Sequence, residues 1–296
     1  STDANPETVT NLAQKAGYKV IPTGIDHGTV TVTSGGIPHE ITTYRKDIET
    51  DGRRAVVAFS TSMHEDAKRR DFTMNALYAN ASGDVIDPLG GIDDLQARRV
   101  RFIGSASDRI REDYLRILRF FRFTAWYGDA NLGFDADALA AIGSSLAGLE
   151  TLSKERIGSE VKKLLLASNP STAIAVMQQT GVLNAIIEGA DSKALAILVH
   201  NEASIDVAPD FPRRLASLGG RNVGDALRLS KSDVRDTSAV RNGATEIGSP
   251  KELGYRLGAK LGLDAELLRS ALLETSFDMT AASIITAAAS EIFPIK

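Results

Sequence analysis

With 296 residues, of which 43% are hydrophobic and 24% charged, the chain is long enough for two or more domains with their own cores. Its 34 Lys and Arg residues against 38 Asp and Glu residues give a formal charge of −4, which excludes a bulk polycation and leaves nucleic-acid binding to local basic clusters. The absence of cysteine excludes disulfides and thiolate metal sites, and no run of about 18 apolar residues suggests a membrane span. We therefore expect no membrane partner and a reducing cytoplasmic location.

The beginning of the chain predicts a helix followed by a hairpin. A helix is expected over residues 6–16, because Asn5 is a favourable N-cap and a proline follows it. Alternating residues over 29–33, the turn at 34–36 and a second alternating run over 39–44 predict a β-hairpin.

Shorter segments follow the hairpin. Residues 55–59 fit a further short strand, although the Ser-Thr-Ser after them also fits a loop. Residues 71–79 are expected to be helical, and residues 84–87 to be extended up to Pro88.

After residue 92 the pattern becomes helical and remains so. This change from hairpins to helices places a domain boundary near 90–95 and predicts an α+β protein. Helices are expected near 135–147, 154–167, 170–180, 192–200, 211–219, 250–260, 264–274 and 279–291.

The helical part opens with acids and arginines at three- and four-residue spacing. If 112–123 is a helix, Glu112, Asp113 and Arg116 fall on one strip, which Arg119 and Arg122 continue. A carboxylate beside a guanidinium offers an acceptor next to donors, which suits the exocyclic amine and ring nitrogen of cytosine or adenine. Uracil and guanine present the opposite polarity. On spacing alone, however, the same strip could be a solvated helix face with weak ion pairs.

A second motif makes the nucleotide interpretation stronger. Three cations, Lys68 to Arg70, precede Asp71 and a Phe-Thr-x-Asn-Ala turn that contains Asn75. Cations followed by an acid and an amide make a plausible site for a triphosphate and a ribose.

These motifs resemble those of the class II tRNA nucleotidyltransferase and bacterial poly(A) polymerase family, which includes the CCA-adding enzymes. Residues 69–76 match its ribose and nucleotide motif, residues 87–94 its hinge motif, and residues 112–122 its base-reading motif. Residues 22–43 are similar to its catalytic-domain sheet, and residues 153–157 to its next helical motif.

The chain departs from the family pattern at its beginning. Family members open with a Gly-Gly-x-x-Arg-Asp loop and an Asp-x-Asp pair that holds two magnesium ions. The present chain, which begins at Ser1, is expected to start just after the second of those aspartates. The resemblance therefore implies Mg²⁺ as the cofactor of an intact enzyme, no catalytic aspartate pair in this chain, and negligible transfer by the chain alone.

The resemblance also implies an architecture. We expect an N-terminal nucleotidyltransferase palm with a mixed β-sheet, followed by an all-α neck, body and tail. The expected ranges are 1–92 for the palm, 93–150 for the neck, 151–235 for the body and 236–296 for the tail.

The implied function is template-independent addition of CMP or AMP, from CTP or ATP, to the 3′ end of tRNA. Asp113 and Arg116, with Glu112, would read the base, while Arg119 and Arg122 would support the base strip or the triphosphate. Two alternatives remain open: a poly(A) polymerase, which shares the motifs, and a noncatalytic RNA- or nucleotide-binding protein derived from the family.

The remaining roles concern the triphosphate and the metal. Arg70 would bind triphosphate or ribose, and Asp71 and Asn75 would orient it. Glu40 lies on the strand after the hairpin turn, on the face opposite Ile41, and is the candidate third carboxylate at the metal pair. A solvent-facing strand glutamate is the equally weighted alternative.

Overall fold

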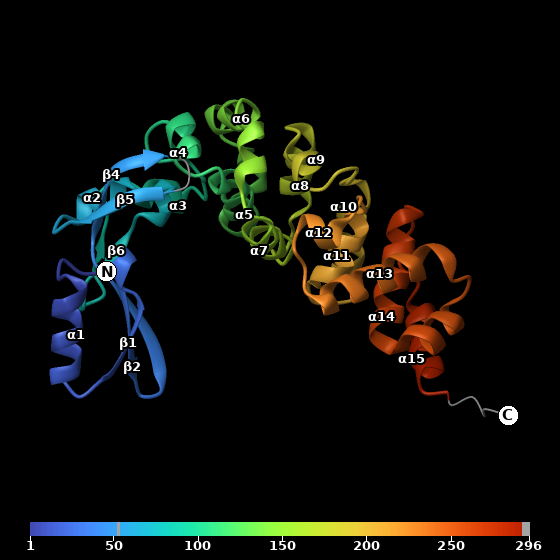
Figure 1. Cartoon of the computed structure of the whole chain (residues 1–296). Helices are drawn as coiled ribbons and strands as arrows, with labels where there is room; N and C mark the ends of the chain where they lie inside the picture. Colours follow the sequence, from blue (N-terminus) through green and yellow to red (C-terminus); the bar gives the residue numbers. More distant parts are fainter. Residues whose placement is uncertain (52–53, 292–296) are drawn as a thin grey trace. The chain divides into compact units, whose positions relative to one another are not determined.

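The computed structural model describes residues 1–51 and 54–291, which form two compact units (Figure 1). The first unit comprises Ser1–Arg116 with Phe134–Ala138, and the second comprises Ile117–Gly133 with Leu139–Lys296. The named strands lie in the first unit, whereas the described part of the second is helical, so the expected α+β class is confirmed. The division into four domains remains a prediction.

The first unit begins with helix α1 (Pro6–Lys15), as expected. The Asn5 side chain accepts a hydrogen bond from the Thr8 N–H at 2.8 Å, which satisfies one of the donors that a helix start leaves unpaired. Val9 of this helix packs against Val30 and Val32 and forms the local core.

The expected hairpin is confirmed as β2 and β3 of a three-stranded antiparallel sheet in the order β1-β2-β3. Gly35 and Gly36 make its turn with positive φ angles of 55° and 80°, which favour glycine. Two further antiparallel pairs join β4 to β5 and β6 to β7, and Thr2 adds one parallel bridge to Thr43. The strands are β1 (Lys19–Gly24), β2 (Thr29–Ser34), β3 (Ile37–Thr42), β4 (Arg45–Asp51), β5 (Arg54–Phe59), β6 (Tyr78–Ala79) and β7 (Val85–Ile86).

The expected strand at 55–59 and the extended piece at 84–87 therefore exist, but the expected helix over 71–79 is wrong. That segment contains only the 3₁₀ turn η2 (Thr73–Asn75) before β6. The backbone pairs with a neighbouring segment instead: Ile103 N–H donates to the Asp71 carbonyl at 3.0 Å, and Thr73 N–H donates to the Arg101 carbonyl at 3.1 Å. These hydrogen bonds replace those of a helix.

From residue 92 onward the named regular elements are helices. Several of these helices begin at a side-chain cap; for example, the Ser153 hydroxyl accepts from Arg156 N–H at the start of α7. Within the described residues, no helix has the length and apolar character needed to cross a membrane. The α-helices after α1 are α2 (Met63–Lys68), α3 (Ile92–Gln96), α4 (Ala106–Glu112), α5 (Leu115–Tyr127), α6 (Ala136–Gly143), α7 (Lys154–Leu165), α8 (Ser171–Gln179), α9 (Val182–Ile186), α10 (Lys193–Ser204), α11 (Phe211–Leu218), α12 (Val223–Ala226), α13 (Lys231–Glu246), α14 (Pro250–Leu272) and α15 (Met279–Ala289). The further 3₁₀ helices are η1 (Ile25–His27), η3 (Ala130–Leu132) and η4 (Leu146–Thr151).

Helices α9, α12 and α13 of the second unit were not expected, and α14 differs from the two helices expected over its range. Helix α13 has a polar sequence in which Val240, Gly243 and Ala244 are the buried residues. Its apolar face is therefore too narrow to produce a recognisable helical periodicity in the sequence. The segments expected as two helices over 250–274 form α14, which is interrupted at Gly258, where φ is 77° and ψ is 177°.

Buried ion pairs join several helices of the second unit. Arg213 and Arg214 of α11 are each 2% exposed. Arg213 donates from Nε to Glu202 Oε1 at 2.7 Å and from Nη1 to Asp264 Oδ1 at 2.6 Å. Arg214 donates from Nε to Glu202 Oε2 at 2.8 Å and from Nη1 to the Leu165 carbonyl at 2.7 Å. Glu202 therefore uses both oxygens to hold two buried cations.

These carboxylates keep Arg213 charged inside the unit. Burial alone lowers the pKa of Arg213, but the adjacent Glu202 and Asp264 outweigh burial and hold that pKa above the ordinary arginine value. The cluster thereby links α10, α11 and α14, and any loss of one carboxylate leaves a buried positive charge uncompensated.

We expect Glu202→Gln to lower the free energy of unfolding of this protein by roughly 3–5 kcal/mol, because it removes one partner of a buried ion pair. Urea titration followed by far-ultraviolet circular dichroism measures the change. The matched control is Glu188→Gln, whose pair with Arg221 is formed by side chains that are 68% and 76% exposed. Loss of such an exposed pair costs at most about 1 kcal/mol. Equal effects of the two substitutions would contradict the structural role of the buried cluster.

Candidate functional site

The predicted triphosphate and ribose motif at residues 68–75 forms a turn in the first unit. Asp71 is only 5% exposed, and its Oδ1 atom accepts hydrogen bonds from Phe72 N–H at 3.0 Å and from Asn75 Nδ2 at 2.9 Å. The Asn75 carbonyl accepts from Arg70 Nη1 at 3.1 Å. The structure thus brings Arg70, Asp71 and Asn75 together, and local hydrogen bonds fix their relative positions.

The Arg70 guanidinium is held from two sides. Its Nη2 atom lies 3.4 Å from Asp66 Oδ2, and its Cζ atom lies 4.8 Å from the centre of the Tyr78 ring. The Nε atom is buried, and the described residues give it no hydrogen-bond partner. Because the side chain is 29% exposed, Arg70 combines a fixed position with access to a ligand.

Asp66, which the sequence analysis did not single out, organises this corner of the site. It is 4% exposed, and it accepts from Arg45 N–H at 3.1 Å and from the Tyr78 hydroxyl at 2.6 Å. Burial, followed by the hydrogen bond to Asp66, raises the pKa of Tyr78 above its ordinary value, so the hydroxyl stays protonated and donates. The i,i+4 spacing of Asp66 and Arg70 was the signal that could have identified this partner.

The predicted hinge segment at residues 87–94 packs against the backbone of the same turn. Although burial raises the pKa of Asp87, hydrogen bonds from the backbone N–H groups of the loop outweigh burial and lower it. The N–H groups of Gly91 and Ile92 donate to Asp87 at 2.8 and 2.9 Å. A Cβ atom on Gly91 would lie 2.2 Å from the Thr73 carbonyl oxygen, so only glycine allows this close approach.

The predicted base-reading motif at residues 112–122 does not lie on one continuous helix, so the helix expected over 112–123 is wrong. Helix α4 ends at Glu112, Asp113 is extended with φ −157° and ψ 107°, and α5 begins at Leu115. The cause is local: Asp113 Oδ1 accepts from Leu115 N–H at 3.1 Å, and the Asp113 carbonyl accepts from Arg116 N–H at 3.0 Å. An aspartate that caps a following helix interrupts the preceding one.

Glu112 and Arg116 nevertheless meet across this break. The Arg116 Nη1 atom contacts Glu112 Oε2 and donates to the Arg109 carbonyl at 2.8 Å. Arg109 Nη1 donates to the same Glu112 oxygen at 2.8 Å. Arg116 Nη2 then donates to the Arg69 carbonyl at 3.1 Å, next to Arg70 in the chain. The structure therefore connects the two predicted motifs through the Arg116 guanidinium.

Arg119 and Arg122 lie further along α5, in the second unit. Arg122 Nε donates to Glu160 Oε2 of α7 at 2.6 Å, and the guanidiniums of Arg119 and Arg122 lie 5.4 and 4.5 Å from the centre of the Phe123 ring. These contacts lie within the second unit.

The predicted metal ligand Glu40 is exposed on β3, opposite Thr31 of β2. Across 1–51 and 54–291, the described side chains form no group of three or more His, Cys, Asp or Glu residues that could hold a metal ion. An Asp-x-Asp sequence does occur at 135–137, but Asp135 Oδ1 there accepts from Ala138 N–H at 2.8 Å and caps α6. The metal role of Glu40 remains a prediction.

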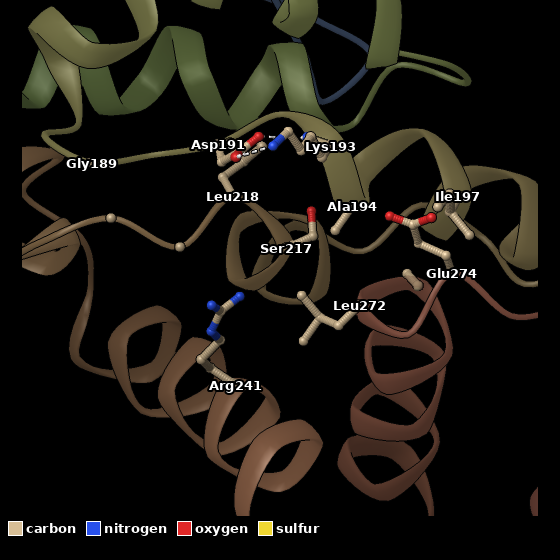
Figure 2. A pocket seen from close by; sticks show the side chains of 13 residues that line it. Gly189, Asp191, Lys193, Ala194, Ile197, Ser217, Leu218, Arg241, Leu272 and Glu274 are labelled. Atoms are coloured by element: carbon tan, nitrogen blue, oxygen red, sulfur yellow. Dashed lines mark hydrogen bonds and ion pairs between the residues drawn. The ribbon is translucent and has the colours of Figure 1, made fainter.

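The second unit also contains a cavity of about 310 Å³ that involves none of the predicted site residues. Figure 2 shows Arg241 directed from α13 toward Ser217 at the end of α11. Lys193 and Asp191 line another side and lie 3.8 Å apart, and Glu274 supplies a second carboxylate. Two cations are thus balanced by two carboxylates, and this cavity shows no preference for a charged ligand.

Comparisons with known proteins match this arrangement. The family model described as "Poly A polymerase head domain" matches residues 1–101, and the model described as "Probable RNA and SrmB- binding site of polymerase A" matches residues 131–193. The chain is similar to the mitochondrial CCA tRNA nucleotidyltransferase 1 of Danio rerio, with 40% identity over 183 residues, which are 62% of this chain and 42% of that protein.

Two further proteins resemble a larger share of the chain. The CCA-adding enzyme of Streptococcus sanguinis (strain SK36) is 39% identical over 275 residues, covering 86% of this chain and 66% of that enzyme. The crystal structure of the Bacillus stearothermophilus CCA-adding enzyme in complex with CTP has a TM-score of 0.71 and 27% identity, and covers 97% of this chain and 71% of that one.

The chain spans 42% of the length of the mitochondrial relative. Its two matched regions follow each other in the family order, and the similarity to CCA-adding enzymes extends through both units. These agreements show that this chain belongs to the tRNA nucleotidyltransferase and poly(A) polymerase family.

Proposed function

We propose that this chain forms the nucleotide- and RNA-binding part of an enzyme that adds CMP or AMP, from CTP or ATP, to the 3′ end of tRNA. The observation that supports this most directly is the hydrogen bond from Arg116 to the Arg69 carbonyl. It joins a segment suited to base recognition to a segment suited to triphosphate binding. The relatives named as CCA-adding enzymes, and the solved one in complex with CTP, support the same substrate class.

The proposed base selection depends on the guanidinium N–H groups of Arg116 that its contacts within the protein do not use. A guanidinium has five N–H donors, and the contacts with Glu112, Arg109 and Arg69 account for three of them. Nε–H and one Nη2–H can therefore donate to a base acceptor. With the Asp113 carboxylate as acceptor for an exocyclic amine, the pair suits cytosine and adenine and opposes uracil.

Triphosphate binding is proposed for Arg70, whose cationic side chain is held in place and is 29% exposed, so that a phosphate oxygen can approach it. Asp71 and Asn75 act by holding the turn in shape. Arg119 and Arg122 are proposed to add positive charge for the incoming nucleotide or the RNA, and Glu160 fixes the position of the Arg122 guanidinium.

The residues described do not form a complete site for the Mg²⁺ ions that the family implies, because Glu40 is the single proposed ligand. We therefore assign this chain's own residues to binding and orientation. A poly(A) polymerase is the second candidate, supported by the family description of residues 1–101, and product length distinguishes it from an enzyme that adds a fixed terminus. The cytoplasm is the proposed location, supported by the lack of cysteine.

We expect the 1–296 polypeptide alone to bind CTP but to transfer it negligibly. The test is incubation with labelled CTP, Mg²⁺ and tRNA that lacks its 3′ terminus, in parallel with calorimetric titration of CTP. Robust incorporation of label by this polypeptide would contradict the proposal that it supplies recognition without a full metal site. Absence of CTP binding would contradict the proposed function itself.

Asp113→Asn should weaken the preference for CTP over UTP by roughly tenfold, because one good bidentate base contact is worth about 1–3 kcal/mol. Asparagine still caps α5, so the fold is retained. Competition between CTP and UTP in the binding assay reports the preference. Arg111→Ala is the control, because Arg111 is 67% exposed and pairs with Asp108 on the same helix α4.

Arg70→Ala, measured beside it, should raise the dissociation constants for CTP and UTP by the same factor, since phosphates carry no base identity. Each charge-assisted contact is worth roughly 1.5–3 kcal/mol. A selective loss of CTP in Arg70→Ala, or an unchanged preference in Asp113→Asn, would reverse the assigned roles.

A further inference from the structure

Helix α5 carries a stripe of arginines and aromatic rings at three- and four-residue spacing: Arg119, Arg122, Phe123, Trp126 and Tyr127. Phe123 forms the base of this stripe and is 8% exposed. The guanidiniums of Arg119 and Arg122 lie over its ring at 5.4 and 4.5 Å, and the Tyr127 ring centre lies 5.4 Å away. Phe123 is thus covered by its neighbours, and the exposed aromatic surface of the stripe belongs to Trp126 and Tyr127.

Trp126 is held in place although its ring is 45% exposed. Its Nε1–H group donates to the Lys163 carbonyl of α7 at 2.8 Å, which occupies the only polar group of the indole. Tyr127 is 46% exposed beside it. Two large rings with a fixed position and accessible surface make a stacking platform that loses little conformational freedom when a ligand binds.

The charge around these rings is positive. Glu160 of α7, with a side chain 5% exposed, accepts from Arg122 Nε at 2.6 Å and from Lys163 Nζ at 3.2 Å. Two cations therefore share one carboxylate. Lys163 is 55% exposed, so its ammonium group can also reach an anion in solution. These residues lie on helices α5 and α7 (Figure 1).

We propose that the stripe, with Lys163, binds the unpaired 3′-terminal nucleotides of an RNA, whose bases stack on Trp126 and Tyr127 while its phosphates approach Lys163. A flat aromatic group joined to negative charges fits this surface, and every base has a face that can stack. Bases in a duplex hide those faces, which selects a single-stranded end. The choice of an RNA end rests on the proposed function.

Trp126 is the single tryptophan of the chain, so fluorescence excited selectively from tryptophan reports on this platform. The probe is a short single-stranded RNA that ends in two cytidines, titrated into the 1–296 protein. We expect saturable quenching of the tryptophan signal. The same strand with abasic terminal nucleotides keeps its phosphates and should leave the signal unquenched, as should the strand annealed into a blunt duplex. Binding of the probe without quenching would overturn the proposal.

Variants separate stacking from charge. Measured by fluorescence anisotropy of labelled RNA, Trp126→Ala should raise the Kd about tenfold without changing its salt dependence. Lys163→Gln should reduce the slope of log Kobs against log salt by about 0.7 for one lost phosphate contact. Tyr255→Ala is the control, because Tyr255 of α14 is 48% exposed and belongs to the same unit. Equal effects of Trp126→Ala and Tyr255→Ala would overturn the proposal.

CTP binding, measured separately from RNA binding, tests the proposed function. A wild-type protein that binds CTP but neither binds nor is quenched by the RNA overturns this inference and leaves the proposed function standing. A protein that binds the RNA through Trp126 but does not bind CTP supports the stripe and contradicts the proposed nucleotide site.

Discussion

The Arg116 guanidinium is the contact on which the candidate site depends. It contacts Glu112 and donates to the carbonyls of Arg109 and Arg69, so one planar group connects the end of α4, the start of α5 and the turn at residues 69–75. These segments are 47 residues apart in the chain at the Arg116–Arg69 hydrogen bond. Because a guanidinium donates in a fixed plane, satisfying these acceptors also sets the direction of its remaining donors. Recognition of a base edge requires this kind of fixed direction.

Three of the predicted cations are partly neutralised by buried or half-buried carboxylates within their own units, and this has a functional consequence. Asp66 holds Arg70, Glu112 holds Arg116, and Glu160 holds Arg122. Each carboxylate reduces the electrostatic attraction for phosphates but removes the cost of ordering a long side chain when the ligand arrives. The arrangement therefore favours selectivity over a diffuse attraction for anions, in agreement with a chain whose formal charge is −4.

Local signals in the sequence were sufficient for α1, with its Asn5 cap, and for the hairpin of β2 and β3. Local signals were not sufficient where tertiary contacts determine the structure of a segment. The segment at 71–79 pairs with residues 101–103, which no local pattern records. Helix α13 was missed because few of its residues are buried. In the site, both motifs could be identified, and the i,i+4 spacing indicates the pair of Asp66 and Arg70. The break at Asp113 and the contacts of Asp66 with Arg45 and Tyr78 could not be predicted, since each depends on which of several possible hydrogen bonds forms.

The measurement that tests the central claim most directly is the CTP-over-UTP preference of Glu112→Gln. Glutamine keeps the size of the side chain but replaces the ion pair with Arg116 by a weaker hydrogen bond to a neutral acceptor. The account predicts that the preference falls by up to about tenfold while the affinity for the triphosphate group is retained. The matched control is Asp108→Asn, whose side chain is 60% exposed on the same helix α4 and pairs with Arg111. An unchanged preference in Glu112→Gln, equal to that of the control, would contradict the claim that Glu112 positions Arg116 for base recognition.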